Sequence, residues 1–233
     1  MVLYAPLLSN HYPLGRRIGI TLQRLLVTFF SLMMILLGCE ALKQPSPIIT
    51  ATRTTVPPLL DTPTYSMATR NENDGTTNMN ILTYATPVSV RPDRVWTLGL
   101  YKETLSYDNF VRERTCILQL LTKEHIPLVK ILGGTSGRDV DKAQECELLG
   151  FSWGSLSANH DAEEELPNVL PNCAYYLKLT AIGDIVDCGS HCVAICKVDD
   201  MLVSDEGSKT DYVSTAILRD LGIITEQGRV AED

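Results

Sequence analysis

The sequence predicts a mainly β protein with peripheral helices, built as a closed or split β-barrel behind an N-terminal extension. Short segments with the composition of strands recur at close spacing from residue 64 onward. The regular crossover helices that a parallel sheet requires are missing between them. The chain has 233 residues, which suits one domain with a leader.

The first 61 residues are interpreted as a targeting leader and linker, followed by one domain over residues 62–233. Residues 16–41 resemble a signal peptide, because Arg16, Arg17 and Arg24 precede an apolar run that ends in small residues. Residues 42–61 resemble an organellar transit segment. Up to Leu60 they contain no acid, and they are rich in Ser, Thr and Pro.

A signal peptide followed by a transit-like tract is the bipartite arrangement of proteins sent to plastids bounded by extra membranes. The sequence therefore predicts a plastid location. Two alternatives stay open: a signal anchor with a stalk in the secretory pathway or a membrane, and a lipoprotein with Cys39 in a bacterial lipobox. The apolar run from Leu25 to Leu37 is short for a membrane span of about 20 residues.

The domain begins with an expected strand at Thr64–Arg70 and a hairpin turn at Asp74-Gly75. Two further strands, joined at Arg91-Pro92-Asp93, are expected within Met79–Thr104. The next expected elements are a helix capped by Ser106 and reaching Arg114, a buried strand Thr115–Leu121, a helix His125–Leu132 capped by Thr122, and a helix Asp139–Leu149.

The C-terminal part alternates between strands and turns after a polar, acidic loop at Gly154–Pro171. The expected strands are Cys173–Ile182, Ile185–Cys188 and His191–Val203. A terminal amphipathic helix is expected over Asp211–Leu221, with Val213, Ile217 and Leu221 on one face.

Composition and cysteine spacing exclude several classes of protein. A net charge of −8 argues against a nucleic-acid binder, which needs a basic face. Seven cysteines include no C-x-x-C pair and the histidines show no metal-ligand spacing, so no metal site is expected. If their segment is one strand, Cys188, Cys192 and Cys196 share a face and are expected to be core residues.

Two features near the expected turns have competing interpretations. Gly133–Gly137 resembles a phosphate loop but lacks the Lys-Ser/Thr ending, so a helix-to-helix connection is favoured. His191 is the one histidine of four that lies within the folded β region. A structural hydrogen bond and a functional role are equally compatible with its position at a strand start.

The stretch Met79–Thr104 carries the strongest indication of a binding site. Its hydroxyl and polar side chains are followed at once by the cation Lys102. A phosphate close to a dianion is satisfied by neutral donors with one or two cations, and a flavin ring needs an apolar wall. The candidate cofactor-binding residues for flavin mononucleotide (FMN) are Asn80, Thr83, Tyr84, Ala85, Thr86, Ser89, Lys102 and Thr104.

In these motifs the sequence resembles the flavin reductase-like family, the FMN-binding split barrels. The resemblance covers roughly Thr64 to Val203. The segments that carry it are Asn73-Asp74-Gly75, Asn78-Met79-Asn80, Thr83 to Pro87, Val88-Ser89-Val90, Arg91-Pro92-Asp93, Val95 to Leu98, Asn109-Phe110, Cys116 to Leu120, Gly137, Asp141-Lys142, Asp187 to His191, and Val193 to Val198.

The resemblance implies an FMN-binding oxidoreductase that takes reducing equivalents from NAD(P)H, and a homodimer with flavin near the interface. Lys102 and Thr104 match the family's phosphate positions, and His191 would lie near the flavin ring or the nicotinamide as a catalytic residue. Asn80 replaces the usual Thr, and one Pro stands where the family often has two. The alternatives are a non-catalytic flavin-binding or sensing module and a pyridoxamine-phosphate-oxidase-like or haem-handling barrel.

Overall fold

The computed structural model of the chain describes residues 22–34, 49–55, 58–156, 165–204 and 211–231. The chain divides into two compact units, 1–56 and 57–233, and each is described by itself. In the first unit, residues 22–34 form a helix. Within the described residues, no helix is both long enough and apolar enough to cross a membrane. The rest of the expected signal peptide-like segment lies outside these residues.

The described part of the second unit combines eight strands with short helices. The strands are β1 (Tyr65–Arg70), β2 (Thr77–Leu82), β3 (Ala85–Ser89), β4 (Val95–Tyr101), β5 (Thr115–Leu120), β6 (Tyr175–Ala181), β7 (Val186–Cys188) and β8 (His191–Val203). The helices are α2 (Leu105–Glu113), the 3₁₀ helix η1 (Lys123–Leu128), α3 (Val129–Gly134), α4 (Lys142–Leu148) and α5 (Thr215–Asp220).

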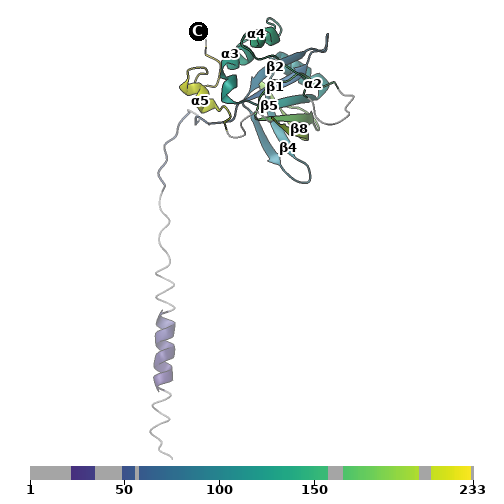
Figure 1. Ribbon diagram of the computed structural model, residues 1–233. Helices are drawn as coiled ribbons and strands as arrows, with labels where there is room; N and C mark the ends of the chain where they lie inside the picture. The colour runs from purple at the N-terminus through teal and green to yellow at the C-terminus, as the bar shows by residue number, and fades with distance from the viewer. Residues whose placement is uncertain (1–21, 35–48, 56–57, 157–164, 205–210, 232–233) are drawn as a thin grey trace, which may run out of the picture. The chain divides into compact units, whose positions relative to one another are not determined.

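All strands belong to one antiparallel sheet with the order β2-β1-β5-β6-β8-β4-β3, and β7 pairs with β8 (Figure 1). The two edge strands, β2 and β3, are consecutive in the chain. Only Thr83 and Tyr84 separate them, so the sheet must curl until its edges meet. The predicted mainly β split barrel is therefore confirmed.

Of the three hydrophobic clusters among the described residues, the two larger ones lie on opposite sides of this curled sheet. The inner core takes residues such as Met67, Leu98 and Leu118 from several strands and Phe110 from α2. The outer core lies over β1, β2 and β5, where side chains such as Met79 pack against Leu128 of η1 and Leu132 of α3. Figure 1 shows α3 and α4 next to β2 on this side of the sheet.

The outward face of β4 and β8 stays accessible. Along β8, the buried side chains of Cys192, Ala194 and Cys196 alternate with Val193 and Ile195, which are not buried. Since successive side chains of a strand point to opposite faces, Val193 and Ile195 lie on the outward face. The register pairs these two residues with Gly99 and Thr97 of β4. This outward face carries part of the predicted site.

Several element predictions hold and several are wrong. His191–Val203 is a strand with the expected bounds, and Gly133–Gly137 lies in and after α3, before α4. The stretch Met79–Thr104 includes the end of β2 as well as β3 and β4, because the chain breaks its strand at Thr83 and Tyr84. The acidic loop Gly154–Pro171 is irregular in its described part, while residues 157–164 lie outside the described residues.

The helix after β4 begins at Leu105 and is not capped by Ser106, which the sequence predicts as its cap. Thr104 is its N-cap and accepts a hydrogen bond from the Tyr107 amide, as an N-cap hydroxyl does. The Ser106 hydroxyl is buried and instead accepts a hydrogen bond from Asn78 Nδ2 at 2.7 Å. The Ser106 hydroxyl, which was expected to cap the helix, is therefore used in a tertiary hydrogen bond to Asn78 of β2.

Two further predictions about faces are wrong. Leu221 is exposed, while Leu218 is buried with Val213, because α5 begins only at Thr215. Cys188 is exposed on β7, while Cys192 is buried on β8, because the chain turns between them. At the start of the domain, Thr215 donates to the Leu60 carbonyl, so α5 also contacts residues before the expected boundary at residue 62.

Candidate functional site

Three aromatic rings gather where β4 ends and β8 begins. Tyr101 and His191 are direct partners in the β4–β8 register, and their ring centroids are 5.2 Å apart. The ring of Tyr84, from the connection between β2 and β3, lies 5.6 Å from the His191 ring. We call Tyr84, Tyr101 and His191 the aromatic cluster. It lies on the outward face, and Tyr84 is 62% exposed to solvent.

Gly99 makes the position of Tyr84 possible. A Cβ atom built at Gly99 would lie 2.9 Å from the Tyr84 Cβ, closer than real Cβ atoms approach. The Gly99 amide donates a 2.7 Å hydrogen bond to the Tyr84 carbonyl. Because Gly99 has no side chain, the Tyr84 backbone can lie directly against β4, and its ring reaches His191.

Hydrogen bonds orient two members of the aromatic cluster. His191 Nδ1 and Ser190 Oγ are 2.9 Å apart, with the donor depending on the histidine tautomer. The Tyr101 hydroxyl donates to Glu103 Oε2 at 2.6 Å. This bond to a carboxylate raises the pKa of Tyr101, so its phenol stays protonated and a donor. The predicted catalytic residue His191 is thus at a strand start, as expected, and belongs to the cluster.

Lys102 follows Tyr101 directly but contacts a different group. Its Nζ forms an ion pair with Asp187 Oδ2, and its amide donates to the Ser190 carbonyl at 3.1 Å. In the β7–β8 register Asp187 pairs with Cys192, so both point to the inner side of the hairpin. His191 points outward, and the Lys102–Asp187 pair therefore lies on the other side of the hairpin from the aromatic cluster.

A second cation, Arg138, contacts the start of α2. Arg138 Nη1 donates to the Glu103 carbonyl at 2.9 Å, and its other nitrogen pairs with Asp108. The hydroxyl of Thr104, a predicted phosphate ligand, accepts a hydrogen bond from the Tyr107 amide as the helix cap and donates one to the Tyr101 carbonyl. Both cations near this helix start are therefore already paired with carboxylates.

Asn80, Thr83 and Ala85 lie beside the closing point of the barrel. Asn80 pairs with Met67 and shares its inner side, and its Oδ1 is buried with no described hydrogen-bond partner. Such an orphaned acceptor is costly in a protein interior. Ala85 packs against the inner core, and Thr83 is half-buried between β2 and β3.

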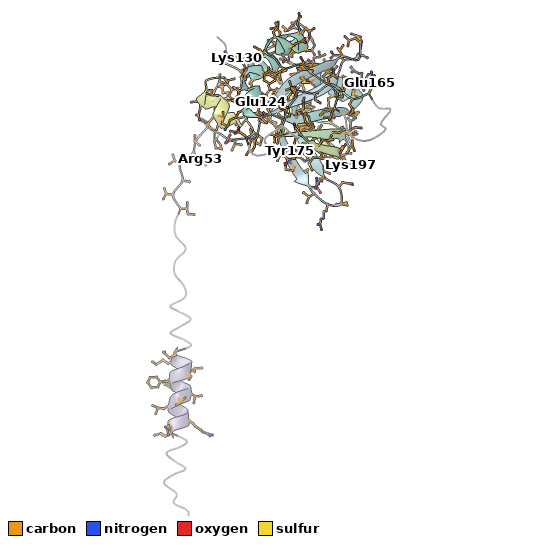
Figure 2. All side chains as sticks on the ribbon, in the orientation of Figure 1. Arg53, Glu124, Lys130, Glu165, Tyr175 and Lys197 are labelled. Carbon is orange, nitrogen blue, oxygen red and sulfur yellow. The ribbon has the colours of Figure 1, made fainter. Side chains whose placement is uncertain are left out.

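Thr86 and Ser89 lie away from the aromatic cluster. Thr86 pairs with Thr97, whose β8 partner is Ile195, four residues and roughly 13 Å along the strand from His191. Ser89 pairs with Val95, whose partner on β8 is Lys197, labelled in Figure 2. The structure therefore does not place these two hydroxyls at the aromatic cluster.

The sequence reasoning missed Tyr101, Gly99 and Asp187. A glycine inside a strand indicates a close backbone approach, so Gly99 carried a usable signal. Asp187 was part of a recognised motif, yet nothing local indicated that it would pair with Lys102, 85 residues earlier. Among the described residues, no group of three or more His, Cys, Asp or Glu could hold a metal ion.

Comparison with known proteins identifies the fold and its family. The family model described as "Flavin reductase like domain" matches residues 59–217. Flavoredoxin from Methanosarcina acetivorans is 11% identical, with a TM-score of 0.56, over 72% of this chain and 86% of its own. No curated protein matches the sequence.

A second solved structure is similar in the same way. It is the FMN-binding protein from Thermus thermophilus with bound 1-cyclohex-2-enone, 16% identical, with a TM-score of 0.52, over 78% of this chain and 86% of its own. At such identities the likeness shows the fold alone. The family match covers more than half of the chain, so this protein belongs to the flavin reductase-like family.

The residues of this site fit a flavin in two respects. The aromatic cluster offers ring surfaces, and Lys102 is a cation one residue from Tyr101, while the unused acceptor Asn80 Oδ1 lies on the inner side of the sheet, away from the cluster. A flavin ring needs apolar surface and a few polar groups, and its phosphate needs a cation. One feature opposes a phosphate: Asp187 already neutralises Lys102.

Proposed function

We propose that this protein is a flavin-dependent oxidoreductase that binds FMN and takes reducing equivalents from NAD(P)H. The single observation that carries the proposal is the aromatic cluster in a flavin reductase-like domain, with Lys102 directly after Tyr101 in the chain. The sequence has no G-x-G-x-x-G motif for a separate dinucleotide-binding domain, which favours FMN over FAD and a nicotinamide that meets the flavin at this site.

The chain's own residues have defined tasks in this proposal. The rings of Tyr84, Tyr101 and His191 bind and orient the flavin ring, and Lys102 contacts the phosphate across the edge of the β7–β8 hairpin. Glu103 holds the Tyr101 hydroxyl in place, and Ser190 orients the His191 ring. When bound, the flavin supplies the hydride chemistry, while the protein supplies binding, orientation and shielding.

Titration of the purified apoprotein with FMN, FAD and riboflavin tests cofactor choice. We expect FMN to bind more tightly than FAD, and tighter FAD binding would contradict the assignment. Anaerobic mixing of the FMN-loaded protein with NADH or NADPH then tests the activity through bleaching of the flavin absorption band. A flavin that binds but is not reduced would indicate a sensing module, and a haem spectrum would refute the proposal.

We also propose that the protein is a homodimer through the outward face of β4 and β8. The support is the exposed apolar surface there, which includes Tyr84, Val186 and Ile195 at 62, 55 and 40% exposure. Contiguous exposed apolar surface marks interaction sites. Light scattering is expected to give twice 25.8 kDa, and Ile195→Glu is expected to give the monomer mass. A monomeric wild type would contradict this proposal.

The N-terminal unit is proposed to direct the protein to a plastid through a bipartite leader. The support is that the described helix 22–34 covers most of the apolar run expected for the signal-peptide part of such a leader. A fluorescent protein fused after residue 61 tests the proposal by its location in cells with complex plastids. Retention in the secretory pathway or at a membrane would favour the signal-anchor alternative.

A further inference from the structure

Lys102 is held by the β7–β8 hairpin through both its backbone and its side chain. Its amide donates to the Ser190 carbonyl, and its Nζ pairs with Asp187. The Lys102 side chain is 29% exposed, whereas that of Asp187 is 74% exposed. The pair is therefore open to solvent on the carboxylate side, and an incoming anion would reach Lys102 where Asp187 now lies.

Asp187 is fixed in this position by its own turn. Its second carboxylate oxygen, Oδ1, accepts a hydrogen bond from the Gly189 amide at 3.0 Å. The hydrogen bond from Lys102 lowers the pKa of Asp187, so the carboxylate remains charged at neutral pH. The other titratable neighbours of Lys102 are Tyr107 and Cys192, and burial raises the pKa of the Cys192 thiol. Asp187 is thus the anion that neutralises Lys102.

We propose that Asp187 determines phosphate affinity by competing with the flavin phosphate for Lys102. This inference rests on the proposed function. Binding of FMN exchanges one anion for another at the same ammonium group, so the net gain from the phosphate is smaller than a free lysine would give. The ring contacts on the other side of the hairpin are unaffected. Asp187 thereby makes the flavin more easily exchanged.

The test compares FMN and riboflavin affinities in full-length variants. Asp187→Asn removes the competing charge while keeping the side-chain shape, and Asp187→Ser serves as a second variant. Asp184→Asn is the matched control, because Asp184 is exposed in the connection just before β7 and has no described ion pair with Lys102. Thermal melting of each variant confirms that it is folded.

We expect Asp187→Asn to raise FMN affinity about two- to tenfold, since an exposed ion pair is weak and a like charge near the phosphate is removed. Riboflavin affinity is expected to change less than about twofold, as is FMN affinity in Asp184→Asn. In a Lys102→Ala background the effect of Asp187→Asn is expected to shrink below about twofold, because no cation is left to compete for.

An unchanged or lower FMN affinity in Asp187→Asn and Asp187→Ser would overturn the inference. An equal gain with and without Lys102 would also overturn it, because the carboxylate would then act only as a distant charge. Failure of the proposed function has a different signature: the wild type would bind neither FMN nor riboflavin. If the wild type binds both, the comparison of variants decides the role of Asp187 alone.

Discussion

The close approach of Tyr84 to β4 leads to a sharp prediction for Gly99→Ala. The new Cβ would lie 2.9 Å from the Tyr84 Cβ and 3.5 Å from its Cδ2. Tyr84 cannot simply rotate its ring away, because the closest atom is its Cβ, next to the backbone. That backbone is hydrogen-bonded to Gly99 at 2.7 Å. The connection between β2 and β3 must therefore move as a unit.

The expected cost is that of overpacking a well-fitted contact, about 1–3 kcal/mol. The domain unit spans residues 57–233, and for domains of this size each kcal/mol shifts the melting temperature by about 2–4 °C. We therefore expect a decrease of roughly 2–12 °C. Because the Tyr84 ring must leave His191, flavin binding is expected to weaken as well.

Thermal melting and flavin titration of Gly99→Ala measure both effects. Gly154→Ala is the matched control, because no atom lies within 4 Å of the Cβ it would add. That control is expected to melt at or slightly above the wild-type temperature. If Gly99→Ala melts with the control and binds flavin normally, the close packing of Tyr84 on β4 is not what positions the aromatic cluster.

Three further predictions concern charged and titratable groups. Lys102→Ala is expected to weaken FMN binding about ten- to a hundred-fold and spare riboflavin, and equal losses for both would move the phosphate site elsewhere. Burial lowers the pKa of His125, so its contribution to stability is complete above about pH 6.5 and is lost as pH falls, by up to about 1.4 kcal/mol per pH unit. Urea denaturation of the wild type and of His125→Gln between pH 7.5 and 5.5 tests this prediction. Parallel pH profiles of the free energy of unfolding would contradict it. Burial also lowers the pKa of Lys142 to about 8. The buried amine therefore loses its proton above about pH 8, and the cost of burying its charge disappears. The stability of the wild type is expected to rise relative to Lys142→Met between pH 8 and 10, and a constant difference would show that this amine stays charged.

The domain start offers one more test of the boundaries. The sequence predicts that residues before 62 contribute nothing to folding, yet Arg219 and Thr215 donate to the Leu60 carbonyl at 2.6 and 3.0 Å. A protein beginning at residue 57 is expected to melt with the full chain, and one beginning at 62 is expected to melt slightly lower. Identical melting of both would show that the Leu60 contacts add nothing.

Local patterns in the sequence determined most of the elements. The alternation over His191–Val203 predicted a strand with the correct bounds, and Asp74-Gly75 marked a turn in which Gly75 has a φ of +68°. These signals are short-range, because strand periodicity and turn chemistry depend on residues a few positions apart. Closely spaced strands without crossover helices between them predicted a closed or split barrel rather than a parallel sheet, and the observed sheet is antiparallel.

The geometry of the site was decided by tertiary structure. Lys102 and His191 were both identified from the sequence, but only the β4–β8 and β7–β8 registers place them on opposite sides of a hairpin. A shift of one residue in either register would exchange the faces. β7 and β8 are joined by the short Gly189-Ser190 turn, but β4 and β8 are about ninety residues apart in the chain, so no local signal specifies the β4–β8 register. What specifies it is the burial of alternate side chains such as Cys192 in the barrel interior, which only the folded chain brings about.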